Sequence, residues 1–135
     1  MIVLDSSAAV AMVRSTAEGQ ALSTLILQDE LVISSEMFIP EVRSAFWKYV
    51  RANLMTVEEA TFYIDHATKL IDRFIPLREN ADESFVEAVR QNHSIYDMFY
   101  LTLVRRTAGT LFSLDKQLIN LCKGMGLNAV TEIRV

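Results

Sequence analysis

Short apolar runs rich in β-branched residues alternate along the chain with longer stretches whose apolar residues recur at helical spacing. The short runs predict five β-strands, at Ile2–Leu4, Leu31–Ile33, Phe74–Pro76, Thr110–Leu114 and Asn128–Val130. The longer stretches predict six α-helices, at Thr16–Gln28, Pro40–Arg51, Val57–Asp72, Ala81–Gln91, Tyr96–Arg106 and Asp115–Cys122. Strands that are apolar on both faces and alternate with helices form a mostly parallel sheet covered on both sides. We therefore predict a three-layer α/β/α fold with a mostly parallel central sheet, in a single domain over residues 1–135.

Two local signals support the predicted helix ends. Thr56 has Glu59 three residues later, which is the pattern of a capping box at a helix N-terminus. Gly109 follows Arg105 and Arg106. This order predicts a helix end at which the basic side chains complement the helix dipole and the glycine takes the left-handed turn.

Composition narrows the class of protein. The chain of 135 residues is 51% hydrophobic and 22% charged, which provides enough apolar surface for the core of one ordinary domain. Its single cysteine, Cys122, excludes an internal disulfide framework. With only His66 and His93 as histidines, no group has the spacing of a zinc site. We therefore expect a reducing, cytoplasmic environment.

Membrane insertion and binding to bulk nucleic acid are both disfavoured. The longest uncharged stretch, residues 19–28, is about half of what a membrane-spanning helix needs, and the N-terminus lacks the basic segment of a secretory signal. The chain has 13 basic and 17 acidic residues, a net charge of −4. Nucleic-acid binding by charge alone requires many Lys and Arg residues. Binding of a polyanionic substrate would therefore depend on a local feature of the binding site and not on the overall charge of the chain.

Four acidic residues lie at the ends of predicted elements. Asp5 and Asp115 directly follow strands, whereas Glu41 and Asp97 lie in the first turns of helices. Because ligands of an open α/β sheet bind beyond the carboxyl ends of its strands, all four acids should face one crevice. Each acid alone could merely cap a helix or complement its dipole, an effect of roughly 0.3 to 1 kcal/mol. Capping alone would not place all four acids at the same edge of the sheet, so their shared position favours a common site.

Carboxylates gathered in one crevice repel one another unless a cation joins them. Hard oxygen ligands suit Mg²⁺ or Mn²⁺, and such ions commonly serve phosphoryl chemistry. Without the four acids, the chain has 13 acidic residues against 13 basic ones, so the acidic excess equals the predicted site. We therefore predict a divalent-metal site that acts on a substrate carrying a phosphate.

Four motifs occur in order along the chain: Leu4-Asp5-Ser6-Ser7-Ala8, Pro40-Glu41-Val42, Ser94-Ile95-Tyr96-Asp97-Met98-Phe99-Tyr100 and Phe112-Ser113-Leu114-Asp115-Lys116. Together they resemble the PIN-domain ribonucleases, and among these the VapC-type toxins of prokaryotic toxin–antitoxin pairs. The resemblance covers nearly the whole chain. It implies a PIN-like fold and an endoribonuclease dependent on Mg²⁺ or Mn²⁺. In it, Asp5, Glu41, Asp97 and Asp115 would bind the metal and activate water, Ser113 would support the acids by hydrogen bonding, and Ser6 would lie beside the first acid.

The resemblance also implies partners. Relatives usually form homodimers, are inhibited by a cognate antitoxin, and cut structured RNA such as transfer RNA. Two alternatives stay open: a non-catalytic PIN-like module that binds RNA or protein, and a solitary RNA-processing nuclease. A haloacid-dehalogenase-type phosphatase is excluded because the position two residues after Asp5 is Ser7 instead of a second Asp. A response-regulator receiver is disfavoured because the first strand supplies only one acid.

Other side chains allow two interpretations. His93 is suited either to contact a substrate phosphate or act as a general acid, or to lie in a solvated loop. Seven bases near the motifs either follow an RNA backbone or cover solvated helix faces: Arg14, Arg43, Lys48, Arg90, Arg105, Arg106 and Lys116. Six aromatic residues either pack in the core or form a dimer or antitoxin interface: Phe38, Phe46, Trp47, Tyr49, Phe62 and Tyr63.

Overall fold

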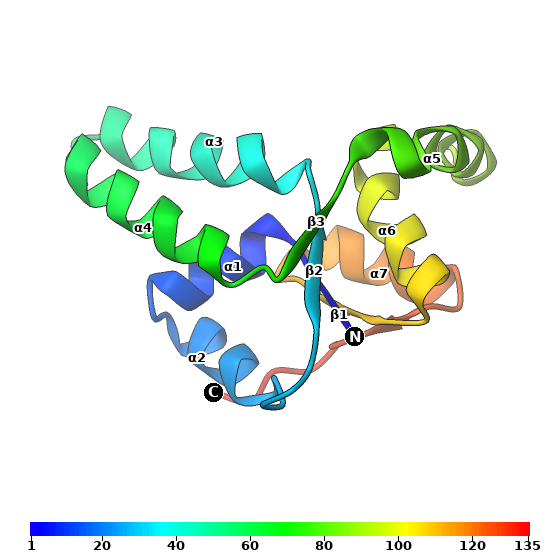
Figure 1. Cartoon of the computed structure of the whole chain (residues 1–135), viewed down its shortest axis with the longest axis horizontal. Coiled ribbons are helices and arrows are strands. Elements are labelled where there is room, and N and C mark those ends of the chain that lie inside the picture. Colours follow the sequence, from blue (N-terminus) through cyan, green and yellow to red (C-terminus); the bar gives the residue numbers. More distant parts are fainter.

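The five predicted strands form one parallel sheet in the computed structural model, which describes residues 1–135 (Figure 1). They are β1 (Ile2–Leu4), β2 (Val32–Ser35), β3 (Arg73–Ile75), β4 (Thr110–Phe112) and β5 (Asn128–Ala129). Their order in the sheet is β3-β2-β1-β4-β5, and all four pairings are parallel. In the centre, Ile2 pairs with Val32 on one side and with Thr110 on the other. The mostly parallel sheet predicted from the sequence is thus confirmed.

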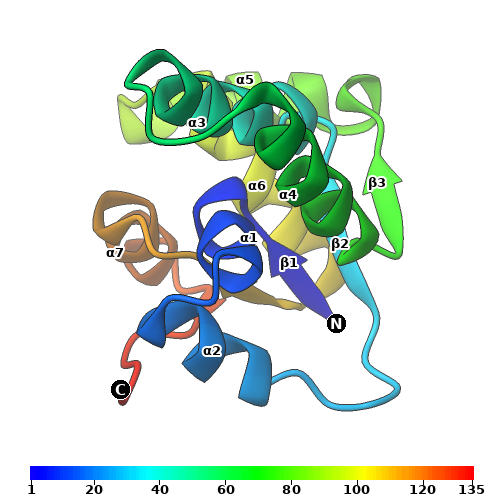
Figure 2. The ribbon, with the colours of Figure 1, turned by 90° about the vertical axis from the view of Figure 1, so that its left-hand side faces the viewer.

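Seven helices cover the two faces of the sheet. They are α1 (Ser6–Val13), α2 (Ala17–Thr24), α3 (Phe38–Arg51), α4 (Val57–Lys69), α5 (Leu77–Gln91), α6 (Ile95–Thr107) and α7 (Lys116–Gly124). Helices α1 to α4 lie on one side, and α5 to α7 lie on the other (Figures 1 and 2). This arrangement confirms the three-layer α/β/α prediction. No helix is both long enough and apolar enough to cross a membrane.

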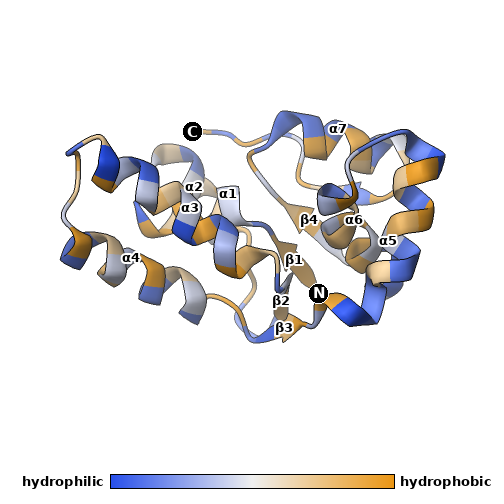
Figure 3. Ribbon diagram, turned by 90° about the horizontal axis from the view of Figure 1, so that it is seen from above, coloured by the Kyte–Doolittle hydropathy of each residue, from blue (hydrophilic) through white to orange (hydrophobic).

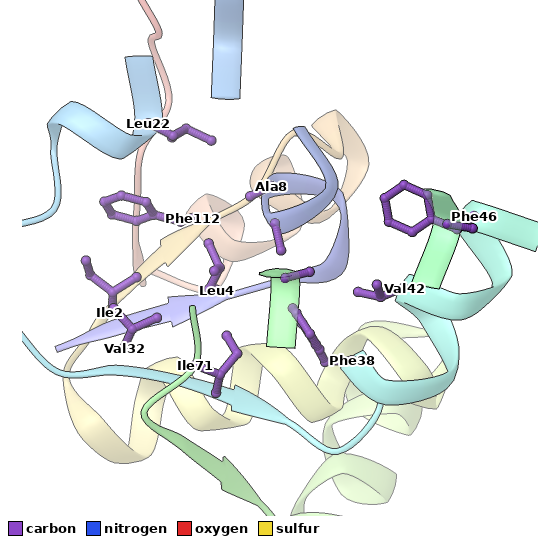
Figure 4. Packing of buried hydrophobic residues seen from close by; sticks show 13 residues of the cluster. Ile2, Leu4, Ala8, Leu22, Val32, Phe38, Val42, Phe46, Ile71 and Phe112 are labelled. Atoms are coloured by element: carbon purple, nitrogen blue, oxygen red, sulfur yellow. The ribbon is translucent and has the colours of Figure 1, made fainter. Parts of the chain in front are cut away.

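Alternate residues of each central strand supply two separate cores, as the period of two in a strand requires. Ile2 and Leu4 pack with helices α1 to α4 (Figure 4), whereas Val3, Ile33 and Leu111 pack with α6 and α7. Apolar residues dominate the strands and α6 (Figure 3). Helix α6 is buried at seven successive positions, residues 98–104.

The helix that the sequence pattern did not predict is α1. Its buried residues are Ala8, Ala9 and Ala11, and the helix contains only small or apolar side chains. Such a segment has no contrast between an apolar and a polar face, so it shows no helical periodicity. Helix α2 is shorter than predicted, because it ends at Thr24 instead of Gln28.

Two other helix ends test the local signals. The capping box is present at α4, where Thr56 and Glu59 each bond to the other's backbone N–H. At the end of α6 the left-handed residue is Ala108, with φ 49°, and not Gly109 as predicted. Gly109 has a different steric role, because a Cβ there would lie 2.9 Å from the carbonyl oxygen of Met1.

The six aromatic residues of α3 and α4 divide between core and surface. Phe38 and Phe46 are buried in the core beneath the sheet. Tyr49 and Tyr63 are half-buried against that core, and Tyr63 stacks on Phe46 with ring centroids 5.6 Å apart. Trp47 is 55% exposed and Phe62 59% exposed. Core packing therefore explains four of the six residues and leaves two at the surface.

Candidate active site

Asp5 is a buried carboxylate at the carboxyl end of the central strand. It follows β1 directly, caps α1 and is only 4% exposed. Its Oδ1 accepts hydrogen bonds from the Ala8 amide at 2.9 Å and from the Ser7 hydroxyl at 2.7 Å. Its Oδ2 accepts a hydrogen bond from the Ser113 hydroxyl at 2.5 Å. Both oxygens are therefore fixed in direction.

The two serines that hold Asp5 also join it to the loop after β4. The Ser7 hydroxyl accepts from the Leu114 amide at 2.9 Å, and the Ser113 hydroxyl accepts from the Asp115 amide at 3.0 Å. Asp115 is exposed and caps α7 by accepting from the amides of the first helical turn. Ser113 thus makes a hydrogen bond to one of the predicted acids, and its role in catalysis stays a prediction.

Glu41 comes from α3, which lies on the same side of the sheet as α1. It lies in the first turn of α3, which begins at Phe38, two residues before the predicted Pro40. The Tyr100 hydroxyl of α6 donates to its Oε1, and the Ser6 hydroxyl donates to the same oxygen at 3.4 Å. Glu41 is therefore tied to two neighbouring helices, and Ser6 lies close to Glu41 instead of hydrogen-bonding Asp5.

Asp97 is the only acid in the first turn of α6 and is half-buried. The Nδ1 of His93 lies 3.6 Å from its Oδ2. The Nε2 of His93 lies 3.5 Å from the side-chain nitrogen of Gln117, in the first turn of α7. His93 thus lies between the two helices that carry Asp97 and Asp115, with a side chain that is only 20% exposed.

The pKa values of three acids are raised, because burial disfavours the charged carboxylate. Burial raises the pKa of Asp5 to about 6, against hydrogen bonds that lower it, and the charge of Glu41 adds to the rise. The pKa of Glu41 is raised by burial and then by the charges of Asp97 and Asp115. The pKa of Asp97 is raised by burial and then by Asp115, while His93 lowers it. The four acids therefore repel one another across a shared site.

The structure brings the four acids into one electrostatic neighbourhood but does not preform a coordination shell. No three His, Cys, Asp or Glu side chains are arranged around a point where they could hold one metal ion. None of the four acids forms an ion pair with Lys or Arg. Hard oxygen donors with raised pKa values and no basic partner match a divalent cation in chemistry and charge. The four carboxylates are therefore suitable ligands for a divalent cation, but their side chains would have to move closer together to bind it.

Two contacts of the site were missed in the sequence. Ser7 was considered only as the absence of a second Asp, although its hydroxyl contacts Asp5 and the loop after β4. Tyr100 lies three residues after Asp97, so both project from the same side of α6. A residue with a polar tip, three positions from the acid on an otherwise apolar helix, was the available signal.

Known proteins similar to this chain share its length and architecture. It is 25% identical over 122 residues to ribonuclease VapC3 of Pyrobaculum aerophilum, covering 87% of this chain and 91% of that protein. The crystal structure of PAE2754 from Pyrobaculum aerophilum superposes with a TM-score of 0.72 at 19% identity, over 95% of this chain and 81% of that one. Mycobacterium tuberculosis VapC20, a toxin that cleaves the sarcin–ricin loop, gives a TM-score of 0.67 at 16% identity, over 98% of this chain and 100% of that one. No family model matches the sequence.

Proposed function

We propose that this protein, which resembles the VapC-type PIN-domain ribonucleases in sequence and has their fold, is a divalent-metal-dependent endoribonuclease. The observation that supports the proposal is that four acids, which follow β1, open α3 and α6 and follow β4, are linked by charge repulsion and have no Lys or Arg partner. A stable fold has no structural need to concentrate unpaired charge in this way, since burial of a carboxylate without a counter-charge is costly.

In this proposal Asp5, Glu41, Asp97 and Asp115 would hold Mg²⁺ or Mn²⁺. The bound ion would lower the pKa of a water molecule and stabilise negative charge on the phosphate oxygens. Ser7 and Ser113 keep the Asp5 oxygens in place, and Tyr100 keeps a Glu41 oxygen in place. The other Glu41 oxygen accepts no hydrogen bond from the protein and is available to a ligand.

The proposed substrate is structured RNA such as transfer RNA, and the proposed role is that of the toxin in a type II toxin–antitoxin pair in the cytoplasm. A cognate antitoxin and a second copy of the chain would cover exposed apolar residues. These occur at the far end of the α3–α4 hairpin and on the outside of α5: Leu54, Val57, Phe62, Phe85, Val86 and Val89. Exposed apolar residues grouped in this way are typical of protein interfaces. A mass in light scattering equal to one chain would contradict the dimer.

The decisive experiment is incubation of total cellular RNA with the purified protein and Mg²⁺ or Mn²⁺. We expect discrete fragments that disappear in EDTA and in the Asp97→Asn variant. Asp65→Asn is the matched control, because Asp65 is an exposed acid of α4 far along the chain from the site. RNA that stays intact under all metal conditions would contradict the nuclease.

A second candidate function is a non-catalytic module with the same fold, and the lack of a preformed ion site favours it. Metal binding separates the two functions without reference to cleavage. The nuclease proposal predicts that Mn²⁺ raises the thermal midpoint of the wild-type protein, with a smaller rise for Asp5→Asn. An equal rise, or none, in both proteins would favour the module.

A further inference from the structure

We propose that the exposed side of α3 is an RNA-binding surface, formed by Arg43, Trp47, Lys48 and Arg51 and here called the α3 stripe. This inference rests on the proposed function, because it places the substrate of the same site. The stripe begins at Arg43, two residues after Glu41 along the chain but on a different side of the helix, and follows α3 away from the carboxyl edge of β2 (Figure 1).

Some of the basic side chains near the motifs are held by contacts with other side chains, whereas others are free to bind a ligand. Arg90, Arg105 and Arg106 form ion pairs with acids of α5. Arg14 donates to the Tyr49 hydroxyl at 2.6 Å and stacks over its ring. Of the seven bases near the sequence motifs, three contact no other side chain through an ion pair or hydrogen bond, although Arg43 donates to the Ile39 carbonyl of its own helix at 3.0 Å: Arg43, Lys48 and Lys116. Two of these three belong to the α3 stripe.

The stripe is continuous and carries one sign of charge. Its four residues lie at positions 43, 47, 48 and 51, which follow one side of a helix, and all are exposed. From Arg43 to Arg51 it extends about 12 Å along the axis, at 1.5 Å per residue. The only acid of α3 is Glu41, which belongs to the candidate site. Lys48 follows Glu41 by seven residues, so both lie on nearly the same side of the helix.

Trp47 gives the stripe a surface for a nucleobase. It is 55% exposed, and the guanidinium of Arg51 lies 5.1 Å from its ring centroid. An exposed aromatic ring among basic side chains is the arrangement by which proteins bind single-stranded nucleic acid, through stacking of bases and neutralisation of phosphates. The neighbouring α4 exposes Glu58, Glu59 and Asp65, so its charge would direct a polyanion toward α3.

Trp47 is the only tryptophan of the chain, so its fluorescence reports on the stripe directly. The probe is an unstructured single-stranded RNA oligonucleotide, titrated in EDTA so that no cleavage occurs. We expect saturable quenching of Trp47, with an affinity that falls as salt rises. In Arg43→Ala/Lys48→Ala, loss of two phosphate contacts should weaken binding at least 5-fold and reduce the salt slope by about 1.4, at about 0.7 per contact.

Trp47→Ala is tested with the same RNA carrying a fluorescent label, and binding should weaken about 5-fold or more, the range measured for loss of one stacked base. The matched control is Lys69→Ala/Lys123→Ala, which removes two positive charges from α4 and α7 and should bind like the wild type. Equal loss of affinity in the control, or no quenching by RNA, would overturn the proposal. A Trp47 signal that depends on protein concentration instead of RNA would also overturn it, by assigning the stripe to a contact between copies.

Cleavage kinetics distinguish failure of this inference from failure of the proposed function. The stripe variants should raise KM for RNA at least 5-fold while kcat stays within about 2-fold of the wild type. If KM is unchanged while Asp97→Asn abolishes cleavage, the stripe is refuted and the nuclease stands. If the protein cuts no RNA but still binds it through Trp47, the nuclease is refuted and the stripe stands.

Discussion

Two groups of charged residues lie at opposite ends of α6 and differ in how their charge is compensated. At the first turn, Asp97 belongs to the acid cluster, which also contains Asp5, Glu41 and Asp115. At the last turn, Arg105 and Arg106 belong to an ion-pair network with Glu83, Glu87 and Arg90 of α5. The acid cluster has no Lys or Arg partner, whereas every acid of the network has at least one.

Each group contains a carboxylate with very little exposed surface, and burial raises the pKa of both. Glu87 is 2% exposed and Asp5 is 4% exposed. Glu87 nevertheless accepts hydrogen bonds from Arg105 and Arg90 at 2.6 Å each, and the Arg105 bond holds the pKa of Glu87 below its usual range. Asp5 has only hydroxyl and amide donors, and its pKa rises to about 6. The comparison teaches that arginine partners turn a carboxylate with little exposed surface into a structural ion pair, whereas a carboxylate without them keeps a raised pKa and is a candidate for function.

The largest effect is expected from a substitution in the acid cluster. Asp97→Asn should lower the rate of metal-dependent RNA cleavage about 1000-fold or more, since loss of a group that holds the metal removes several kcal/mol of transition-state stabilisation. Glu87→Gln should keep the wild-type rate per folded molecule. Rates are measured on a labelled RNA fragment at saturating Mn²⁺. If Asp97→Asn kept a tenth of the wild-type cleavage rate, the proposed role of Asp97 in holding the metal would be contradicted.

The next effect is on the pH dependence of stability. The folded Asp5 has a pKa of about 6 against 3.8 for an ordinary Asp, so the folded state binds the proton more tightly. Without metal, the free energy of unfolding should therefore fall as pH rises from about 4 to about 6, with about 3 kcal/mol due to Asp5. Glu41 and Asp97 act in the same direction, because their pKa values are also raised. Glu87 acts in the opposite direction at the acidic end, because its pKa is lowered.

Urea unfolding in EDTA at pH 4, 5, 6 and 7 measures this dependence. Asp5→Asn cannot ionise, so its stability should fall less over the same range, and the difference between the two proteins isolates Asp5. Identical curves for the two proteins would mean that Asp5 is not responsible.

The ion-pair network should respond in stability instead of activity. Glu87→Gln removes a buried charge that two arginines contact, and it should lower the free energy of unfolding by about 2 kcal/mol. Glu83→Gln, at a more exposed position of the same network, should cost less than about 1 kcal/mol. Urea denaturation at pH 7 compares the two variants. A larger loss for Glu83→Gln would reverse the assigned order.

The smallest effect sharpens the role of the contact between α6 and Glu41. Tyr100→Phe removes the hydroxyl that donates to Glu41, a hydrogen bond worth about 1 kcal/mol. Mn²⁺ affinity, measured by calorimetry, should fall about 5-fold, while the urea midpoint changes little. Tyr96→Phe, at an exposed position of the same helix, is the matched control and should leave Mn²⁺ affinity unchanged. Equal affinities for wild type and Tyr100→Phe would exclude this positioning role.

Elements of the fold could be predicted where the pattern of apolar and polar residues along the sequence is distinct. The strands were recognised because Ile2–Leu4 and its counterparts are short, apolar and β-branched, and the parallel order then followed from alternation with helices. Helix α1 was missed because residues 6–13 contain nothing but small or apolar side chains. The left-handed turn at Ala108 was missed because the glycine signal next to it reflects contact with Met1, a residue 108 positions away.

The acids of the candidate site could be chosen from the sequence, but the contacts between them and their neighbours could not. Asp5 directly follows β1 as predicted, whereas β4 ends at Phe112 instead of Leu114, so Asp115 follows that strand after a two-residue loop. The role of Tyr100 depends on how closely α6 approaches α3, which no local pattern records. Whether the four acids converge on one ion stays a prediction, since their spacing in the fold is set by side-chain conformations.

The position of β1 in the middle of the sheet has a consequence for the order in which the chain can fold during synthesis. Its residues are made well before β4, yet one edge of β1 pairs with Thr110–Phe112, and the Asp5 carboxylate accepts a hydrogen bond from Ser113 just beyond. Contacts so distant along the chain form late. Asp5 can meet its local donors Ser7 and Ala8 early, but it stays without Ser113 until that residue, 108 positions later in the chain, has been made. The four acids are therefore brought together only after β4 and the loop that follows it have been made and have joined the sheet.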